Sequence, residues 1–357
     1  PTRAADVRSA LGKDEALLEY LVAPDGVVGF VVTRDRVTVF HSPVSAENLR
    51  SRVRLARELL SRSRPGDEPV LPSLHAALIA RAGLPPTTRR LIVVPHDVLA
   101  YLPFAALRDE RTGRYLVESY SVVHAPSAMA LTELRARSAR EADVRGAVVF
   151  APFPEQFPAT AVEADALRRT VGAEVRIGPS ASEEQFRRAL GRAAPVHAAS
   201  HGVLNAHNPL FSRIEFASGA RGGHTNDGRL EVHELLDLRI ASPLVFLSGC
   251  ETALGTVGST DFARGEDFAT LAQAFLVAGA QNVWRTLWRV EDAGAAAFAE
   301  RFYTHLAGVS PAEALAAAQR DLLQDSTYGA PFYWAAYTVS GSGQRTAQEP
   351  ADLSVRQ

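Results

Sequence analysis

Residues 243–252 read Pro243-Leu244-Val245-Phe246-Leu247-Ser248-Gly249-Cys250-Glu251-Thr252. The apolar run ends abruptly at a small Ser-Gly pair, and the only cysteine of the chain follows at once. A short apolar run bounded in this way is typical of a strand that is buried on both faces of a parallel sheet. Open α/β sheets present functional groups just beyond the carboxyl ends of such strands. The segment therefore predicts an α/β sheet with Cys250 at its functional edge.

A second apolar strand ends in a comparable way, at Val196-His197-Ala198-Ala199-Ser200-His201-Gly202. Thiol attack needs a thiolate, or a base that takes the proton as the bond forms, and the near-neutral pKa of histidine suits that role. We expect the two strand ends to bring His201 and Cys250 together, with the N–H groups of Gly202 and Cys250 forming an oxyanion hole. A buried structural cysteine is the alternative, since free cysteines are among the most buried residues.

Strand and helix patterns alternate from Gly146 onward, which predicts a mostly parallel sheet flanked by helices. The predicted strands are Ala147–Ala151, Glu174–Ile177, Pro195–Ala199, Leu244–Ser248 and Asn282–Trp288. The predicted helices are Ala161–Thr170, Glu183–Leu190, Asp267–Ala278, Asp292–Leu306 and Pro311–Leu323. A polar hairpin region at Ile214–Leu230, with a Gly-rich bend at Gly219–Gly223, interrupts this order.

The N-terminal part begins with paired strands on either side of the turn Pro24-Asp25-Gly26. Its predicted strands are Leu17–Val22, Val27–Val32, Val37–Phe40, Leu91–Pro95 and Tyr115–Val123, and its predicted helices are Ser45–Leu60, Leu74–Arg81 and Ser127–Arg137. The charged stretch Arg135–Arg145 is the best linker candidate. We therefore expect two subdomains, residues 1–144 and 145–357.

Composition excludes several classes of function. The 357 residues include 38 Lys plus Arg against 40 Asp plus Glu, a net charge of −2, so nothing points to nucleic acid. Neither a secretory signal nor an apolar run of about 18 residues is present, so we expect no membrane segment and a cytoplasmic location. A single cysteine excludes an internal disulfide and a Cys-cluster metal site. The Gly-Thr-Val-Gly at 255–258 lacks the lysine of a phosphate loop, and we expect no metal and no cofactor.

Short motifs follow one another in order along almost the whole chain. They are Leu17-Leu18-Glu19-Tyr20, Val94-Pro95, Leu102-Pro103-Phe104-Ala105-Ala106-Leu107, His197 with His201-Gly202, Leu247-Ser248-Gly249-Cys250-Glu251-Thr252, Ala274-Phe275-Leu276-Val277-Ala278-Gly279-Ala280, Leu287-Trp288-Arg289-Val290-Glu291-Asp292 and Tyr333-Trp334-Ala335-Ala336-Tyr337. In this set and order the chain resembles a CHAT domain, a bacterial relative of caspases and separase that often follows tetratricopeptide repeats. The separation of 49 positions between His201 and Cys250 also resembles that of caspases, whose histidine lies about 50 residues before the cysteine, although the caspase pentapeptide is absent.

The resemblance implies a caspase-like catalytic half after about residue 145, with an inactive caspase-like N-terminal half packed on it. It places the catalytic dyad on His201 and Cys250. It places the substrate-facing strand on Thr286–Val290, whose backbone would pair with an extended peptide. Asp292 resembles the acidic position that gives separase-like enzymes a preference for a basic P1 residue; a helix N-cap is the other interpretation.

Residues beside these motifs are further candidates for substrate binding. They are Trp288, which also fits a packing role, Arg289, and Glu251, whose carboxylate would raise the pKa of the cysteine. His197 lies about a dozen ångströms from His201 along the strand, so we expect it to be structural rather than part of a metal pair.

Together these features predict a cysteine endopeptidase that cleaves a protein substrate through an acyl-enzyme on Cys250. We expect cleavage after a basic P1 residue and regulation by upstream domains, because a chain that starts with Pro1 is expected to be part of a longer protein. The alternative is a non-catalytic peptide-binding module that uses the same groove. An acyltransferase is disfavoured because residues 248–252 lack the Gly-x-Cys-x-Gly nucleophile elbow.

Overall fold

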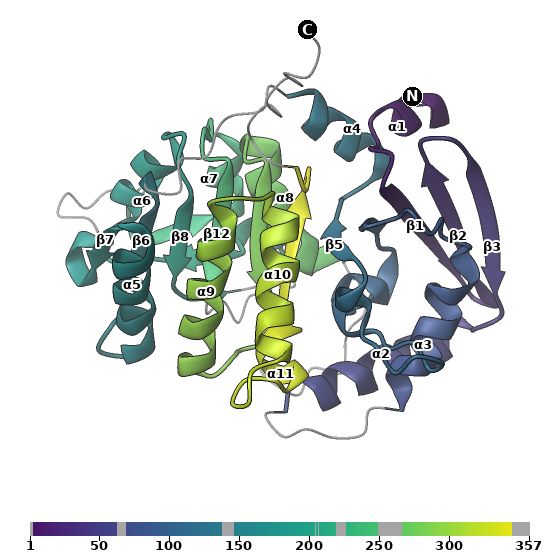
Figure 1. Ribbon diagram of the computed structural model, residues 1–357. Coiled ribbons are helices and arrows are strands. Elements are labelled where there is room, and N and C mark those ends of the chain that lie inside the picture. The colour runs from purple at the N-terminus through teal and green to yellow at the C-terminus, as the bar shows by residue number, and fades with distance from the viewer. Residues whose placement is uncertain are drawn as a thin grey trace, which may run out of the picture.

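The protein is described by a computed structural model over residues 3–62, 69–137, 146–203, 205, 207–218, 226–248 and 266–344. These residues form one eleven-stranded sheet in the order β3-β2-β1-β4-β5-β14-β13-β12-β8-β6-β7, with helices on both faces (Figure 1). The pairs β3–β2, β2–β1 and β14–β13 are antiparallel, and the other neighbours run parallel. The expected fold class, a mostly parallel α/β sheet flanked by helices, is confirmed.

The C-terminal part of the chain supplies six strands of this sheet. They are β6 (Val148–Ala151), β7 (Glu174–Ile177), β8 (Val196–Ala199), β12 (Leu244–Ser248), β13 (Asn282–Thr286) and β14 (Tyr337–Gly341). The prediction of a strand to Trp288 was wrong by two residues. The neighbouring strand β14 begins at Tyr337, opposite Thr286, so the ladder between the two strands ends there.

Helices cover both faces of this part of the sheet. Figure 1 shows α5 (Pro158–Val171), α9 (Asp292–Leu306) and α10 (Pro311–Leu323) side by side on one face. The helices α6 (Glu183–Leu190), α7 (Val232–Leu236) and α8 (Glu266–Ala278) belong to the core on the other face. Strand β12 is apolar at successive positions because its two faces are both buried. Phe246 packs into the core under α5, α9 and α10, and Val245 and Leu247 pack into the core under α6, α7 and α8.

The N-terminal part extends the sheet with β1 (Glu15–Ala23), β2 (Gly26–Thr33), β3 (Val37–Ser42), β4 (Arg90–Val94) and β5 (Ser121–His124). Its helices are α1 (Ala4–Ser9), α2 (Ala46–Leu60), α3 (Val70–Leu78) and α4 (Ala128–Ala136). The strand predicted from Tyr115 begins only at Ser121. The Glu118 carboxylate accepts a hydrogen bond from the Tyr115 N–H, which caps a 3₁₀ turn at Leu116–Glu118 instead.

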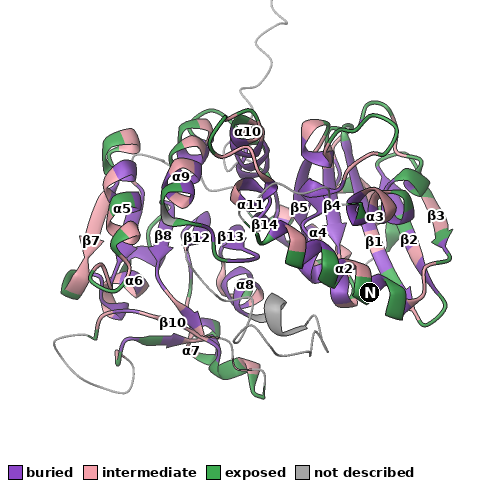
Figure 2. Cartoon of the chain, turned by 90° about the horizontal axis from the view of Figure 1, so that it is seen from below, coloured by how far each residue is buried: buried purple, intermediate pink, exposed green. Residues whose placement is uncertain are grey.

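The polar hairpin predicted at 214–230 forms a small sheet of its own. Strands β10 (Arg213–Glu215) and β11 (Arg229–Glu231) pair with each other, and β10 also pairs with β9 (Gly202–Val203). Figure 2 shows β10 and α7 set apart from the main sheet. The predicted bend at Gly219–Gly223 lies outside the described residues.

The two parts of the chain share one sheet because β14 lies between β13 and β5. Figure 2 shows the central strands buried, whereas the edge strands β7 and β3 are partly exposed. The predicted boundary between residues 144 and 145 falls outside the described residues and remains a prediction. The expected packing of one half on the other takes the form of a continuous sheet.

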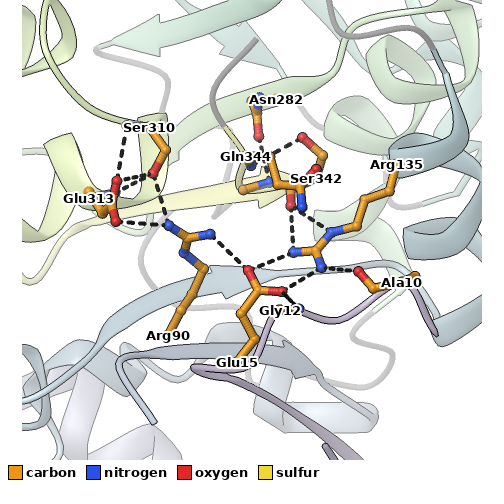
Figure 3. A network of polar contacts seen from close by, with 11 residues as sticks. Ala10, Gly12, Glu15, Arg90, Arg135, Asn282, Ser310, Glu313, Ser342 and Gln344 are labelled. Atoms are coloured by element: carbon orange, nitrogen blue, oxygen red, sulfur yellow. Dashed lines mark hydrogen bonds and ion pairs between the residues drawn. The ribbon is translucent and has the colours of Figure 1, made fainter. Parts of the chain in front are cut away.

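A buried polar network crosses this junction (Figure 3). Arg135 Nη1 donates to Glu15 Oε2 at 2.6 Å, and Arg90 Nη1 donates to Glu15 Oε1 at 2.8 Å. Arg135 also donates to the carbonyl of Ser342, just after β14, and Arg90 donates to Ser310 at the start of α10. The interpretation of Arg135 as the start of a linker was wrong, because its side chain is 5% exposed and binds three segments.

The network holds Glu15 as a carboxylate although its side chain is 3% exposed. Burial alone raises the pKa of Glu15, but the hydrogen bond and charge of Arg135, the Gly12 N–H and the charge of Arg90 bring the pKa below its ordinary value. A carboxyl whose pKa is lower in the folded chain stabilises the fold above its unfolded pKa. That contribution is lost as the pH falls through the folded pKa.

We expect Glu15→Gln to lower the free energy of unfolding at pH 7 by about 3 kcal/mol, because it leaves buried Arg135 without its carboxylate. The difference between wild type and variant should be fully present above the ordinary carboxyl pKa of about 4.3, and it should shrink as the pH falls from there through the lower pKa of folded Glu15. Urea unfolding at pH 7 and at pH 3.5 measures both effects.

The matched control is Glu58→Gln, since the ion pair of Glu58 with Arg62 is 60% exposed on both sides. An exposed pair contributes about 0–1 kcal/mol, so this variant should stay near wild type. Equal losses in the two variants would contradict a structural role for the Glu15 network.

Candidate active site

The carboxyl ends of β8 and β12 define the candidate site. The two strands are parallel neighbours with Ala199 opposite Ser248. Beyond this pair, the Ser200 N–H donates to the Ser248 carbonyl at 3.1 Å. His201 follows Ala199 by two residues, and Cys250 follows Ser248 by two residues. Cys250 itself, with Gly249 and Glu251, lies outside the described residues.

Two aromatic side chains from the loop between β6 and α5 contact the His201 ring. The Phe157 and His201 rings meet edge to face with centroids 3.9 Å apart, and Phe153 stacks on the imidazole with centroids 5.8 Å apart. The guanidinium of Arg289 lies 6.0 Å from the centroid of Phe157. The imidazole orientation is therefore fixed by apolar walls on two sides. No sequence pattern had singled out Phe153 or Phe157.

The backbone of Gly202 is placed by the small sheet. The Glu215 N–H donates to the His201 carbonyl at 2.9 Å, so the His201 carbonyl points toward β10. Successive residues of a strand direct their N–H and carbonyl groups to opposite sides, and Gly202, opposite Ile214, is the next residue. The Gly202 N–H therefore points away from β10.

A cavity of about 230 Å³ opens beside His201. It lies at the carboxyl ends of β8, β12 and β13, under α5 and α9. Most of its wall is apolar, with Phe153, Phe157 and Val290 among the lining residues. Its polar lining includes His201, Ser248, Thr160, Thr286, Arg289 and Glu163. A mostly apolar cavity with a few polar groups is the usual form of a site that binds one side chain or a small molecule.

No sequence pattern had predicted a role for Glu163, a charged residue beside the cavity. Its side chain is 5% exposed on α5; Ser248 Oγ donates to its Oε2 at 3.0 Å, and His197 Nε2 lies 3.1 Å from its Oε1. His197 is fully buried and stacks on Phe246 with ring centroids 4.0 Å apart, as expected of a structural residue. The signal in the sequence was a glutamate at a core-facing position of an otherwise small and apolar helix face.

The segment after β13, which the resemblance predicted as a substrate-facing strand, belongs to a strand only at Thr286. The Leu287 N–H donates to the Ala336 carbonyl at 2.7 Å, which continues the contact with the chain before β14. Trp288 is 6% exposed, and its indole N–H donates to the Phe332 carbonyl at 3.0 Å, whereas Arg289 is exposed. Asp292 is the first residue of α9, so the N-cap is Glu291 rather than Asp292.

Arg57 of α2 reaches this segment from the N-terminal part of the chain. Its Nη2 donates to the Leu287 carbonyl at 2.7 Å and its Nη1 to the Tyr101 carbonyl at 3.3 Å. The guanidinium is buried, and burial lowers the pKa of Arg57 to about 10, so it remains charged at neutral pH. A residue 230 positions away therefore fixes the backbone beside the cavity.

Comparison with known proteins decides the family. The model of the CHAT domain matches residues 68–342, more than three quarters of the chain. The chain belongs to the CHAT domain family. Tetratricopeptide repeat protein 28 of Mus musculus is 27% identical over 301 residues, which cover 71% of this chain and 12% of that protein. The Homo sapiens protein of the same name is 26% identical over 301 residues, with the same coverage of this chain and of that protein. This CHAT chain thus spans about an eighth of the relatives it matches.

One solved structure resembles this CHAT chain almost from end to end. A chain in the crystal structure of the Saccharomyces cerevisiae separase–securin complex superposes with a TM-score of 0.60 at 11% identity. The match covers 95% of this chain and 30% of that chain. At this identity the likeness shows the fold, and it includes both parts of the sheet.

Two features are absent from the described part of the CHAT chain. None of its helices has the length and apolar character needed to cross a bilayer. Within the same residues, no cluster of three or more His, Cys, Asp or Glu side chains could hold a metal ion.

We expect Arg57→Leu to lower the free energy of unfolding by about 2 kcal/mol, because it leaves the buried Leu287 carbonyl without its donor. The control Arg50→Leu removes a half-exposed partner of Asp97 and should cost less than about 1 kcal/mol. Urea unfolding of both variants provides the comparison. Arg57→Leu with wild-type stability would show that this contact does not hold the segment.

Proposed function

We propose that this chain is a cysteine endopeptidase in which Cys250 is the nucleophile and His201 its acid–base partner. The register of β8 and β12 carries the proposal, because both residues follow the paired positions Ala199 and Ser248 by two residues. Two successive Cα–Cα steps span at most about 7.6 Å, which supports the proposal that the thiol lies at the same end of the sheet as the imidazole. Membership of the CHAT domain family supports this assignment.

The reaction uses these groups in two stages. His201 takes the proton of the Cys250 thiol, and the sulfur attacks the carbonyl carbon of the scissile peptide bond. The N–H groups of Gly202 and Cys250 stabilise the resulting oxyanion. The carbon–nitrogen bond then breaks, and His201 gives its proton to the leaving amine. Water attacks the thioester carbon while His201 takes a proton from it. The carbon–sulfur bond breaks, which releases the carboxylic acid product and restores the thiolate beside the protonated imidazole.

Substrate binding is proposed to use the backbone of Thr286–Val290 and the neighbouring cavity. An extended peptide that pairs with this segment gains main-chain hydrogen bonds, and one of its side chains enters the cavity. Trp288, Arg289 and Glu251 border this path in the proposal. The preferred P1 side chain is Arg or Lys, with Asp292 supplying the negative charge.

Upstream domains are proposed to regulate the enzyme. Both curated relatives are tetratricopeptide repeat proteins, and this chain spans 12% of their length. Repeats preceding a CHAT domain would present a binding surface for protein partners. The proposed setting is a reducing cytoplasm, in which a lone thiol stays available for catalysis.

Cleavage of fluorogenic peptides varied at P1 tests the dyad. We expect Cys250→Ala and His201→Ala each to lower kcat/KM by at least about 1000-fold, since dyad members act as a unit. The thermal midpoint of both variants serves as the folding control. Cleavage that survives in folded Cys250→Ala would refute the proposal, and a wild type that binds peptides without cutting them would favour the peptide-binding module.

The P1 preference has its own test. Asp292→Asn should lower kcat/KM for an Arg-P1 peptide on the order of 100-fold, because a charge pair in a desolvated pocket loses one partner. The matched control is the adjacent Glu291→Gln, whose carboxylate accepts a hydrogen bond from the Tyr333 hydroxyl at 2.9 Å and should not affect P1 choice. A preference for Arg that is unchanged in Asp292→Asn would reject Asp292 as the pocket acid.

A further inference from the structure

A single buried carboxylate contacts both strands that lead to the proposed dyad. Ser248 Oγ, at the end of β12, donates to Glu163 Oε2 at 3.0 Å. His197 Nε2, on β8, lies 3.1 Å from Glu163 Oε1, within ion-pair distance but without the alignment of a hydrogen bond. Glu163 therefore connects α5 to a residue four positions before His201 and to one two positions before Cys250.

The contacts continue on the far side of His197. Its Nδ1 lies 3.4 Å from the hydroxyl of Tyr303 on α9, and its ring stacks on Phe246 of β12. Burial, and then the negative charge of Glu163, raise the pKa of Tyr303 above its ordinary value. The phenol therefore stays protonated and able to donate a hydrogen bond. His197 is held between α9, β12 and the carboxylate.

Stability alone does not account for a carboxylate at this position. Moving an ionised carboxyl into the interior costs several kcal/mol, and an apolar side chain of similar size is often neutral or stabilising there. The neighbouring buried positions of α5 do carry apolar side chains, Ala164 and Leu167. Glu163 also lines the cavity beside His201, so the one buried carboxylate among these core positions of α5 lies at the candidate site.

We propose that Glu163 is a positioning residue for the dyad, an inference that rests on the proposed function. Its carboxylate holds the Ser248 end of β12 and the His197 position of β8 against α5, so that the thiol and the imidazole stay within reach. A displacement of about 1 Å in a reacting pair costs on the order of 100-fold in rate. Glu163 therefore acts on the chemical step through Ser248 and His197 rather than by touching the substrate.

The test uses the fact that Cys250 is the only cysteine of the chain. The rate of its alkylation by iodoacetamide, measured from pH 5 to 9, reports the thiol and its imidazole partner without any peptidase activity. The variants are Glu163→Gln, Ser248→Ala and the double variant. The matched control is Asp165→Asn on the same helix, whose side chain is 50% exposed in its ion pair with Arg168.

We expect Glu163→Gln and Ser248→Ala each to slow alkylation at pH 7 at least tenfold and to lower kcat by a similar factor, with KM within twofold of wild type. The double variant should be no slower than the slower single variant, because both changes remove the same contact. Asp165→Asn should match wild type in every measurement.

Folded variants with the wild-type alkylation profile and kcat would overturn the positioning role, as would effects that simply add in the double variant. Ser248→Ala removes one buried hydroxyl only, so it decides the matter alone if Glu163→Gln does not fold. Failure of the proposed function looks different. In that case wild-type Cys250 reacts at the rate of the urea-unfolded chain, and His201→Ala changes nothing.

Discussion

The position of β14 in the sheet determines how every other part of the molecule is arranged. This strand pairs antiparallel with β13 and parallel with β5, where Ser340 lies opposite His124. It comes last in the chain among the described strands, yet it lies in the middle of the sheet. Without it the N-terminal strands and the C-terminal strands would each end at an exposed edge. One continuous core instead extends from β1 across to α5 on the same face.

The seam around β14 contains charges that a purely apolar core would not need. Arg57 and Arg285 are both buried, and burial lowers their pKa values to about 10 and about 9. Arg57 and Arg135 direct their donors to main-chain carbonyls, those of Leu287 and Ser342. Apolar strands of similar residues can pair in more than one register. A guanidinium that must reach one particular carbonyl is satisfied in only one of these registers. These contacts therefore define how the two parts of the sheet meet, and through Leu287 they define one wall of the cavity.

Much of this architecture could be predicted from the sequence, for identifiable reasons. Strand β12 and helices α6, α9 and α10 were predicted with their observed bounds. The strand is apolar from Leu244 to Leu247 and ends at Ser248, and Ser182 and Ser310 provide N-caps for two of the helices. The predictions failed where a distant contact decides the local structure. Arg135 looks like part of a charged linker until Glu15, 120 residues away, is placed beside it.

At the candidate site, too, local patterns were predictable from the sequence and distant contacts were not. His201 could be placed because it ends an apolar strand, and its register with β12 follows from parallel pairing. Phe157 and Glu163 could not be placed, since their roles depend on contacts with His201 and with Ser248, 85 residues beyond Glu163. Local patterns report which face of a helix is buried. They do not report which strand end that face will cover.

The family match and the fold do not have the same extent, and the difference bears on what the N-terminal residues do. The CHAT model begins at residue 68, after β1, β2, β3 and α2. Yet β1 pairs with β4, Glu15 of β1 neutralises Arg135, and Arg57 of α2 binds the Leu287 carbonyl. The separase–securin likeness covers 95% of the chain, which includes part of this region at the least. A chain cut at residue 68 would expose the edge of β4, leave Arg135 without its carboxylate and free the backbone beside the cavity. The first strands and α2 are therefore part of the framework that shapes the candidate site, rather than an appendage to it.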